Sequence, residues 1–188
     1  STRQVDGYRP NLYFALDTSS SMGSSGALSD AVNALDTASG SVANLANLGL
    51  MQFGGDSCPG ATELLDMDGH TAAEFEASYA TISADGNRTT AGALAHIRTN
   101  QLYEVDGDAN SAQRSKAVIL ITNGEPDGCA GQSSVVNEAT ALAADGISVY
   151  IVAFQSSADP GTLRTLAQAG DTGDYYDAQT TRDRKSTL

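Results

Sequence analysis

Short apolar runs alternate along the chain with segments whose apolar residues recur at helical spacing. The four strongest runs cover residues 11–16, 48–53, 117–122 and 147–154. Each run is too short for a helix and is apolar at nearly every position, as strands of a parallel sheet are when both faces are covered. Weaker strand patterns at 63–67 and 174–177 would widen the same sheet.

Helical spacing of apolar residues fills most of the intervals between these runs. The segments concerned are 28–45, 71–82, 94–102, 135–143 and 160–170. Thr71 and Glu74 have the spacing of a capping box, and Asp159 followed by Pro160 is typical of a helix start. The Ser- and Gly-rich stretch 18–26 shows no such spacing, and we expect it to be a loop.

This alternation of strands and helices predicts an α/β fold with an open, mainly parallel sheet covered by helices on both faces. We expect residues 10–178 to form one domain, with 1–9 as an N-terminal extension and 179–188 as a tail. Ligands of such folds bind outside the carboxyl ends of the strands. The candidate segments are therefore those that directly follow a strand: 17–26, 54–61, 123–131 and 155–159.

The charge balance excludes several classes of partner. Ten Lys and Arg residues stand against 23 Asp and Glu residues, so the net charge is −13. Nucleic acids and anionic membranes need clustered cations, and no apolar run approaches the roughly 20 residues of a membrane span. We therefore expect neither nucleic acid binding nor membrane insertion by this domain, whereas divalent cations are compatible with its charge.

Both cysteines, Cys58 and Cys129, lie in polar loop sequence and not in apolar runs. This placement favours a loop-to-loop disulfide, and hence an oxidising compartment, over the alternative of two buried free thiols. Zinc is not expected, because the cysteines and histidines lack ligand spacing. An enzyme is not expected either, because no serine stands in a nucleophile elbow and His70 and His96 both lie in or beside predicted helical segments.

One carboxylate and two hydroxyls leave the end of the first predicted strand at alternate positions: Asp17, Ser19 and Ser21. Mg²⁺ and other hard cations prefer oxygen ligands, so this set would suit an open metal site. The alternative is that Asp17 caps the next helix and that the serines are ordinary loop residues.

The segment 10–23 resembles the opening of a von Willebrand factor type A domain, which has the integrin I-domain fold. Asp17, Ser19 and Ser21 match the D-x-S-x-S motif of that family. Four further segments resemble its second strand, its T-x-T-x-x-A-L loop, its fourth strand with the T-D-G-x-P turn, and its fifth strand. These are, in order, 49–54, 88–94, 117–126 and 146–154. The resemblance covers residues 10–178 and implies a six-stranded sheet with one antiparallel edge strand.

The resemblance also implies a metal-ion-dependent adhesion site at the carboxyl ends of the strands. The residues that match its ligand positions are Asp17, Ser19, Ser21, Thr89 and Asn123. Mg²⁺ is the expected ion, with Mn²⁺ or Ca²⁺ as alternatives, and an acidic group of the partner would complete the coordination.

Two positions depart from the family pattern. Asn123 stands where the family has an aspartate, so the site has one negative charge fewer unless Glu125 or Asp127 compensates. An ungapped alignment places Arg88 at the metal-facing threonine, and a shift of one residue would place Thr89 there. If Arg88 points at the site, its guanidinium would replace the cation, so a weak metal site and a metal-free site both stay open.

We therefore interpret the chain as an extracellular adhesion or ligand-binding domain of a larger secreted or surface-anchored bacterial protein. Its expected partner is a protein or glycan that offers an acidic group to the metal. Two alternatives differ in kind. One is a structural or interaction module with a degenerate metal site, and the other is an intracellular type A domain that serves an ATPase machine.

Overall fold

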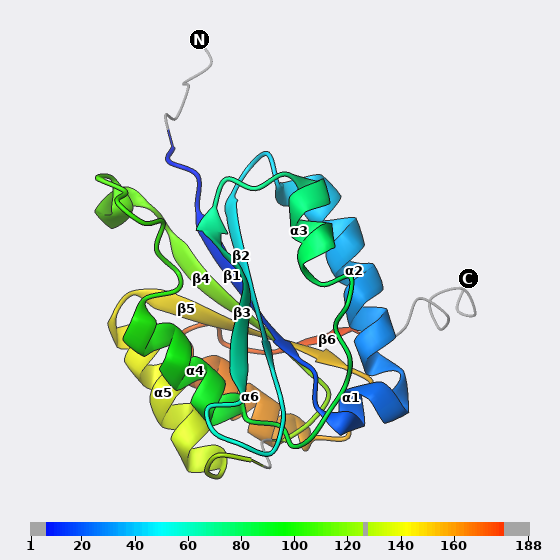
Figure 1. The fold of residues 1–188 in the computed structure, drawn as a ribbon. Coiled ribbons are helices and arrows are strands. Elements are labelled where there is room, and N and C mark those ends of the chain that lie inside the picture. Colours follow the sequence, from blue (N-terminus) through cyan, green and yellow to red (C-terminus); the bar gives the residue numbers. More distant parts are fainter. Residues whose placement is uncertain (1–6, 126–127, 179–188) are drawn as a thin grey trace, which may run out of the picture.

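The computed structural model describes residues 7–125 and 128–178. Six strands form one sheet in the order β3-β2-β1-β4-β5-β6. Their bounds are β1 (Asn11–Asp17), β2 (Asn47–Phe53), β3 (Ala61–Asp68), β4 (Lys116–Thr122), β5 (Ile147–Phe154) and β6 (Tyr176–Ala178). All neighbouring pairs are parallel except β2 and β3, so β3 is an antiparallel edge strand. The predicted fold class is confirmed (Figure 1).

Helices cover both faces of this sheet (Figure 1). They are α1 (Ser20–Ser25), α2 (Ala27–Val42), α3 (Ala72–Ser78), α4 (Thr90–Asn100), α5 (Gln132–Ala144) and α6 (Pro160–Ala169), with a 3-10 turn at Ser111–Gln113. Two apolar cores result. Leu94 of α4, Val135 of α5 and Leu163 of α6 belong to one core. Met22 of α1 and Phe75 of α3 belong to the other, on the opposite face of the sheet.

Most predicted elements lie within two residues of their observed bounds, and the two helix-start signals are present as hydrogen bonds. The Thr71 hydroxyl accepts from the backbone N–H of Glu74 while the Glu74 carboxylate accepts from that of Thr71. Asp159 accepts from the backbone N–H of Thr162, with Pro160 in the first turn.

Several element boundaries differ from the prediction: α2 ends at Val42 and not at 45, α4 begins at Thr90 and not at 94, and α5 begins at Gln132 and not at 135. The stretch 18–26 contains the short helix α1, which fully buries Met22 and ends at Gly26, where φ is +80°. Helix α3 ends at Ser78 and not near residue 82, since the next residue, Tyr79, has a φ of −114°, outside the helical range. The Tyr79 hydroxyl donates to the Asp36 carboxylate of α2 at 2.6 Å. Helix α4 ends at Asn100, before Leu102, because the next residue, Gln101, has a φ of +52°.

None of the helices among the described residues is long and apolar enough to cross a membrane. The predicted tail, 179–188, lies outside the described residues, as does most of the predicted extension, 1–9.

Candidate functional site

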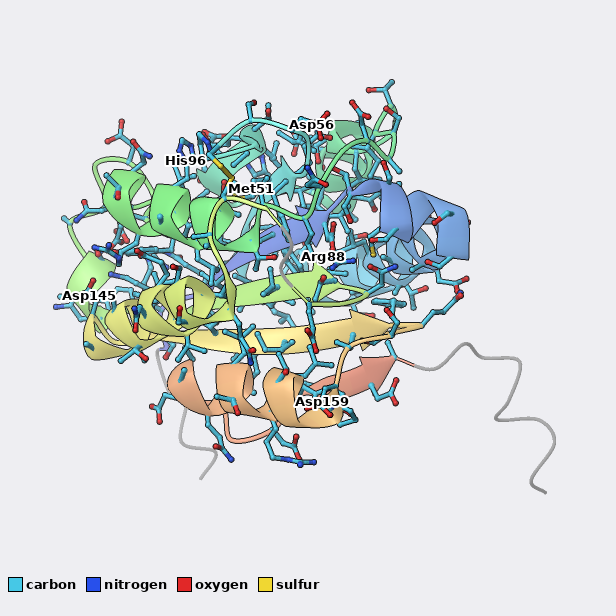
Figure 2. All side chains as sticks on the ribbon, turned by 90° about the horizontal axis from the view of Figure 1, so that it is seen from below. Met51, Asp56, Arg88, His96, Asp145 and Asp159 are labelled. Atoms are coloured by element: carbon cyan, nitrogen blue, oxygen red, sulfur yellow. A yellow bond between two sulfur atoms is a disulfide. The ribbon has the colours of Figure 1, made fainter. Side chains whose placement is uncertain are left out.

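Four loops meet where the parallel strands end, and we call this region the carboxyl-end face. It comprises residues 18–26, 54–60, 85–89 and the described parts of the segment after β4, 123–125 and 128–131. Figure 2 looks onto it, with Arg88 near its centre and with Asp56 and Asp159 on either side.

Asp17, the last residue of β1, is the buried anion of this face. Its carboxylate is fully inaccessible to solvent and accepts three hydrogen bonds. Oδ1 accepts from the backbone N–H of Ser19 at 2.8 Å. Oδ2 accepts from the Thr122 hydroxyl at 2.6 Å and from Nε of Arg88 at 2.8 Å. A buried carboxylate needs such partners, because an unpaired charge in the interior is very costly.

Arg88 brings the opposite charge to the same point and is only 5% exposed. Besides Asp17, its guanidinium reaches residues that follow two different strands. One terminal nitrogen, Nη2, donates to Oδ1 of Asn123 at 2.7 Å and to the hydroxyl of Ser21. The other, Nη1, donates to the backbone carbonyl of Glu125. The arginine therefore ties the loop after β1 to the turn after β4.

Arg88 and its neighbours form one hydrogen-bonded group, which we call the arginine cluster: Asp17, Ser19, Ser21, Ser25, Arg88, Thr122 and Asn123. The hydroxyls of Ser19 and Ser21 lie 3.0 Å apart. Ser21 donates to Oδ1 of Asn123 at 3.1 Å, and Nδ2 of Asn123 donates to the Ser25 hydroxyl at 3.0 Å. The structure thus brings together four of the five predicted metal ligands, namely Asp17, Ser19, Ser21 and Asn123.

The other predicted residues lie differently. Thr89 turns away from the cluster, and its hydroxyl donates to the carbonyl of Gly60 at 3.3 Å, because Arg88 takes the inward position. The carboxylate of Glu125 accepts from the backbone N–H of Asp159 at 3.2 Å, so it faces the start of α6. Asp127 lies outside the described residues.

As arranged, this oxygen set does not fit a divalent cation. Arg88 donates to Asp17, Ser21 and Asn123, so its guanidinium stands between the oxygens that an ion would have to share. Within the described part of the chain, no three His, Cys, Asp or Glu side chains gather as metal ligands would. Sequence reasoning did not identify Thr122 of the arginine cluster or the carbonyl of Glu125. A threonine at a strand end gives no separate signal, and a backbone group gives none.

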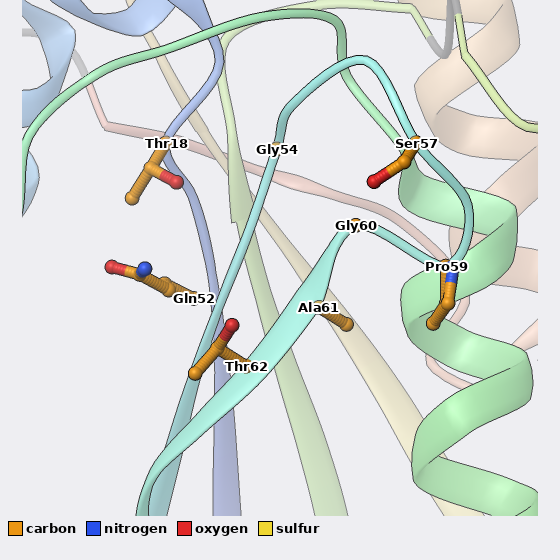
Figure 3. Close-up of a pocket in the computed structure, with 8 residues that line it drawn as sticks. All are labelled: Thr18, Gln52, Gly54, Ser57, Pro59, Gly60, Ala61 and Thr62. Atoms are coloured by element: carbon orange, nitrogen blue, oxygen red, sulfur yellow. The ribbon is translucent and has the colours of Figure 1, made fainter.

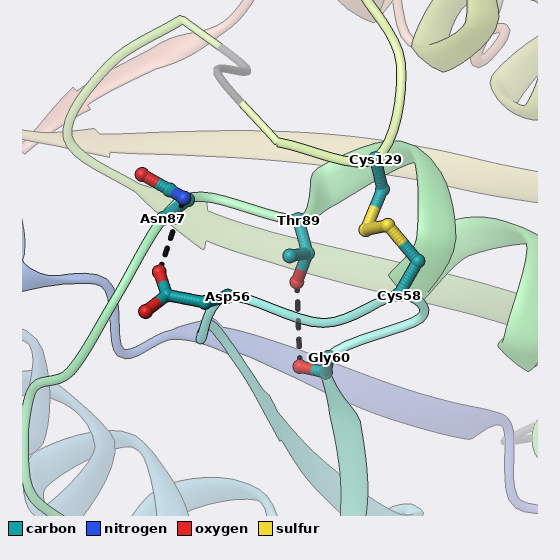
Figure 4. Close-up of a disulfide and its surroundings, with 6 residues drawn as sticks. All are labelled: Asp56, Cys58, Gly60, Asn87, Thr89 and Cys129. Carbon is teal, nitrogen blue, oxygen red and sulfur yellow. Dashed lines mark hydrogen bonds between the residues drawn. A yellow bond between two sulfur atoms is a disulfide. The ribbon is translucent and has the colours of Figure 1, made fainter.

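A disulfide joins the two loops that flank the Arg88 segment. Cys58 belongs to the loop between β2 and β3, and Cys129 belongs to the segment between β4 and α5 (Figure 4). Asn87 donates to the Asp56 carboxylate at 3.1 Å, close to the first cysteine. The bridge predicted from the loop positions is therefore present in the structure, on the same face as Asp17.

Beside the arginine cluster lies a neutral pocket of about 310 Å³. Figure 3 shows that it lies between the end of β2 and the start of β3. Its lining carries hydroxyl and amide groups and no charged side chain: Thr18, Gln52, Gly54, Ser57, Pro59, Gly60, Ala61 and Thr62. Hydroxyls and amides suit neutral polar ligands, but the lining is too exposed to specify one.

The sequence matches the family model of the von Willebrand factor type A domain over residues 11–187. The chain therefore belongs to the von Willebrand factor type A domain family. Domains of this family generally mediate protein interactions, often in adhesion, and are typically not enzymes. A comparison with curated protein sequences finds no significant match.

Solved structures of similar fold come from diverse sources. The conserved hypothetical protein BatB from Bacteroides thetaiotaomicron has a TM-score of 0.71 at 18% identity, over 94% of this chain and 93% of that one. Manganese-loaded TRAP protein from Plasmodium vivax has a TM-score of 0.67 at 19% identity, over 85% and 63%. The pilus adhesin SpaC from Lactobacillus rhamnosus GG has a TM-score of 0.66 at 16% identity, over 91% and 28%. At these identities the likeness shows the fold alone.

Proposed function

We propose that this domain is an extracellular binding module that engages a protein partner through the carboxyl-end face. The observation that carries the proposal is the cross-linking of that face. A disulfide, a buried ion pair and hydrogen bonds between loops hold together segments that lie up to 105 residues apart in sequence. Preorganised loops lose less conformational freedom when a partner binds, so a stiff surface favours affinity.

The location and the class of partner follow from separate supports. A disulfide between surface loops is typical of oxidising compartments, which supports the extracellular or cell-surface assignment and speaks against an intracellular domain of an ATPase machine. The fold is shared with a pilus adhesin, which supports an adhesive role and a bacterial surface protein as the parent chain. A glycan is the second candidate, supported by the neutral polar pocket.

Two versions of the proposal differ in how the partner is held. In the metal-dependent version, Mg²⁺, or else Mn²⁺ or Ca²⁺, bound by Asp17, Ser19, Ser21, Thr89 and Asn123 takes an acidic group from the partner. That version requires Arg88 to leave its place and Thr89 to turn inward. In the metal-independent version the loops bind the partner directly, and no side chain has to move. The geometry favours the second version.

The experiment compares variants that add positive charge at the two ends of the sheet. Ser24→Arg combined with Asp56→Arg alters two exposed residues of the carboxyl-end face. Ser41→Arg combined with Asp106→Arg places the same substitutions near the opposite end, also at exposed residues. Surface plasmon resonance against a panel of immobilised extracellular matrix proteins measures binding, and a glycan array serves as a separate arm.

We expect the face variant to bind at least about tenfold more weakly, since a loss of about 1.4 kcal/mol suffices for that and two added arginines would clash with the partner or repel it. The opposite-end variant should bind like the parent. If both variants lost the same amount of affinity, the contact would not lie on the carboxyl-end face. Binding to glycans and to none of the proteins would favour the second candidate.

A further inference from the structure

We propose that Arg88 is a built-in cation that takes the place of a divalent ion in this domain, so that the arginine cluster works without metal. The inference concerns the face described above, but its test needs no partner. Its failure and the failure of the proposed function can therefore be told apart.

The first support is the set of atoms around the guanidinium. Nε and both terminal nitrogens donate to oxygens of Asp17, Ser21, Asn123 and Glu125. Three of these partners are side chains that the sequence predicts as metal ligands. One planar cation therefore gathers oxygens from the end of β1 and from the turn after β4, which is the bridging role that a metal ion would have.

The second support is charge. Asp17 is fully buried, and Arg88 supplies a positive charge 2.8 Å away. Removing one member of such a pair is strongly destabilising, so the two charges depend on each other. A divalent cation added beside the guanidinium would meet a like charge at close range. To bind, it would have to displace Arg88 from its charge-assisted hydrogen bonds, which are about twice as strong as neutral ones.

The third support is the backbone that carries Arg88. The Arg88 carbonyl accepts from Gly128 N–H at 3.0 Å on one side. On the other side, Asn87 exchanges two backbone hydrogen bonds with Gly55, at 3.1 and 3.2 Å. The disulfide joins the loops that supply these contacts, Gly55 from one and Gly128 from the other (Figure 4). Backbone hydrogen bonds thus hold this segment on both sides, and they restrict movement of the Arg88 side chain away from the site.

Gly124 adds a steric condition to the same arrangement. A Cβ atom at this position would lie 3.0 Å from both terminal nitrogens of Arg88, closer than an ordinary contact. The absence of a side chain there makes room for a guanidinium.

This arrangement changes what a partner can do. A metal ion with an open coordination position can accept a partner's carboxylate directly, whereas Arg88, buried and with its guanidinium bonded to oxygens of its own chain, offers no such position. Partner binding at this face should then be insensitive to chelators, and an acidic group should not be required.

The test titrates chelator-stripped protein with Mn²⁺ by calorimetry and follows the melting temperature with and without Mn²⁺. Wild type should give no saturable heat and no shift. Arg88→Thr combined with Asn123→Asp removes the internal cation and restores a carboxylate, and should gain saturable Mn²⁺ binding with a raised melting temperature. Arg98→Thr, which removes a partly exposed arginine paired with Glu138 on α5, is the matched control and should behave like wild type.

Stoichiometric Mn²⁺ binding by the wild type would overturn the proposal, as would a folded double variant that binds no Mn²⁺. Should the double variant fail to fold even with Mn²⁺, the single variant Asn123→Asp decides. The proposal expects it to bind no metal, because the new carboxylate pairs with Arg88. A site that lacks only one charge would bind Mn²⁺ in this variant, and the proposal would then be wrong.

Discussion

Arginine–aspartate pairs stabilise both ends of the sheet, but they are built in different ways. At the amino ends of the strands, Arg114 pairs with Asp108, six residues away in the same loop. At the carboxyl ends, Arg88 pairs with Asp17 across 71 residues, and the same guanidinium reaches Asn123. The first ion pair lies within one loop, although Arg114 also donates to the Arg9 carbonyl at 2.9 Å. In the second, the ion pair itself joins segments that only the finished fold brings near.

The two ends also differ in how many other charged groups surround the arginine–aspartate pair. A second pair joins Lys116, the first residue of β4, to Glu104 of the amino-end loop, and Ser111 bonds to both members. The charges at the amino end are therefore shared among several groups. The carboxyl-end face relies on Arg88 alone among its described residues to balance buried Asp17. Loss of one side chain should consequently matter far more at that end.

The largest expected effect is therefore that of Arg88→Met. Met has similar length without the charge, so Asp17 would be left buried and unpaired at a cost of about 3–5 kcal/mol in the free energy of unfolding. Arg114→Met, the counterpart at the amino end, should cost less, because Asp108 is not fully buried and Lys116 remains as a second cation near it. Urea denaturation of both variants measures the difference, and similar losses would remove the contrast between the two ends.

The next effect concerns the disulfide, which stabilises only the carboxyl-end face directly. Cys58→Ser with Cys129→Ser should lower the free energy of unfolding by roughly 2–4 kcal/mol, since the bridge closes a long loop in the unfolded chain. Wild type in reductant should match the variant, and its intact mass should rise by two hydrogen atoms on reduction. Hydrogen exchange should speed up around residues 55–60 and 85–89, with little change at 104–115. Uniform acceleration would mean that the two ends are coupled.

A smaller effect is expected at Gly124, where an added methyl group would press on the guanidinium of Arg88. Gly124→Ala should cost about 1–3 kcal/mol, the usual range for overpacking. Gly131→Ala is the matched control in the same segment, because a methyl group there would meet no atom within 4 Å and its φ of −78° suits alanine. Thermal unfolding compares the two, and an unchanged Gly124→Ala would show that the arginine is held loosely.

The smallest effect is a pH dependence at the amino end. The hydrogen bond from Arg114 lowers the pKa of Asp108 below its ordinary value of 3.8. A carboxyl whose pKa is lower in the folded than in the unfolded state adds stability above the unfolded value, and this is lost as pH falls through the folded one. The urea midpoints of wild type and Arg114→Met should therefore converge below pH 3.8. A constant gap down to the lowest pH would contradict the assignment.

The fold was predictable because its signals are local. Each buried strand carries its own apolar run, and the capping box at Thr71 and the Asp159–Pro160 start each lie within four residues. Helix α1 was missed because its Ser- and Gly-rich sequence has low propensity. Burial of Met22 against the sheet stabilises it instead, and that contact is not visible in the sequence.

The site was predictable only in part, because only some of its residues belong to one local sequence motif. Asp17, Ser19 and Ser21 lie in one motif, and topology alone places them at the end of β1. The choice between Arg88 and Thr89 as the inward residue depends on loop geometry, and neighbouring residues of a loop point in different directions. The structure turns Arg88 inward and Thr89 toward Gly60, as the ungapped alignment indicated. The metal ligation itself stays a prediction.

The disulfide also sets how this domain would respond to mechanical load. The start of β1 and the end of β6 lie at opposite ends of parallel strands, so tension between them shears the ladders β1–β4, β4–β5 and β5–β6 (Figure 1). The β5–β6 ladder has only three residue pairs and would separate first. Once β1 is pulled free, the covalent loop from Cys58 to Cys129 cannot lengthen. Its separation of 71 residues withholds about 240 Å of extended chain, at roughly 3.4 Å per residue. Under force the domain would therefore extend only by the chain outside this loop and keep β3, α3, α4 and β4 within a closed ring.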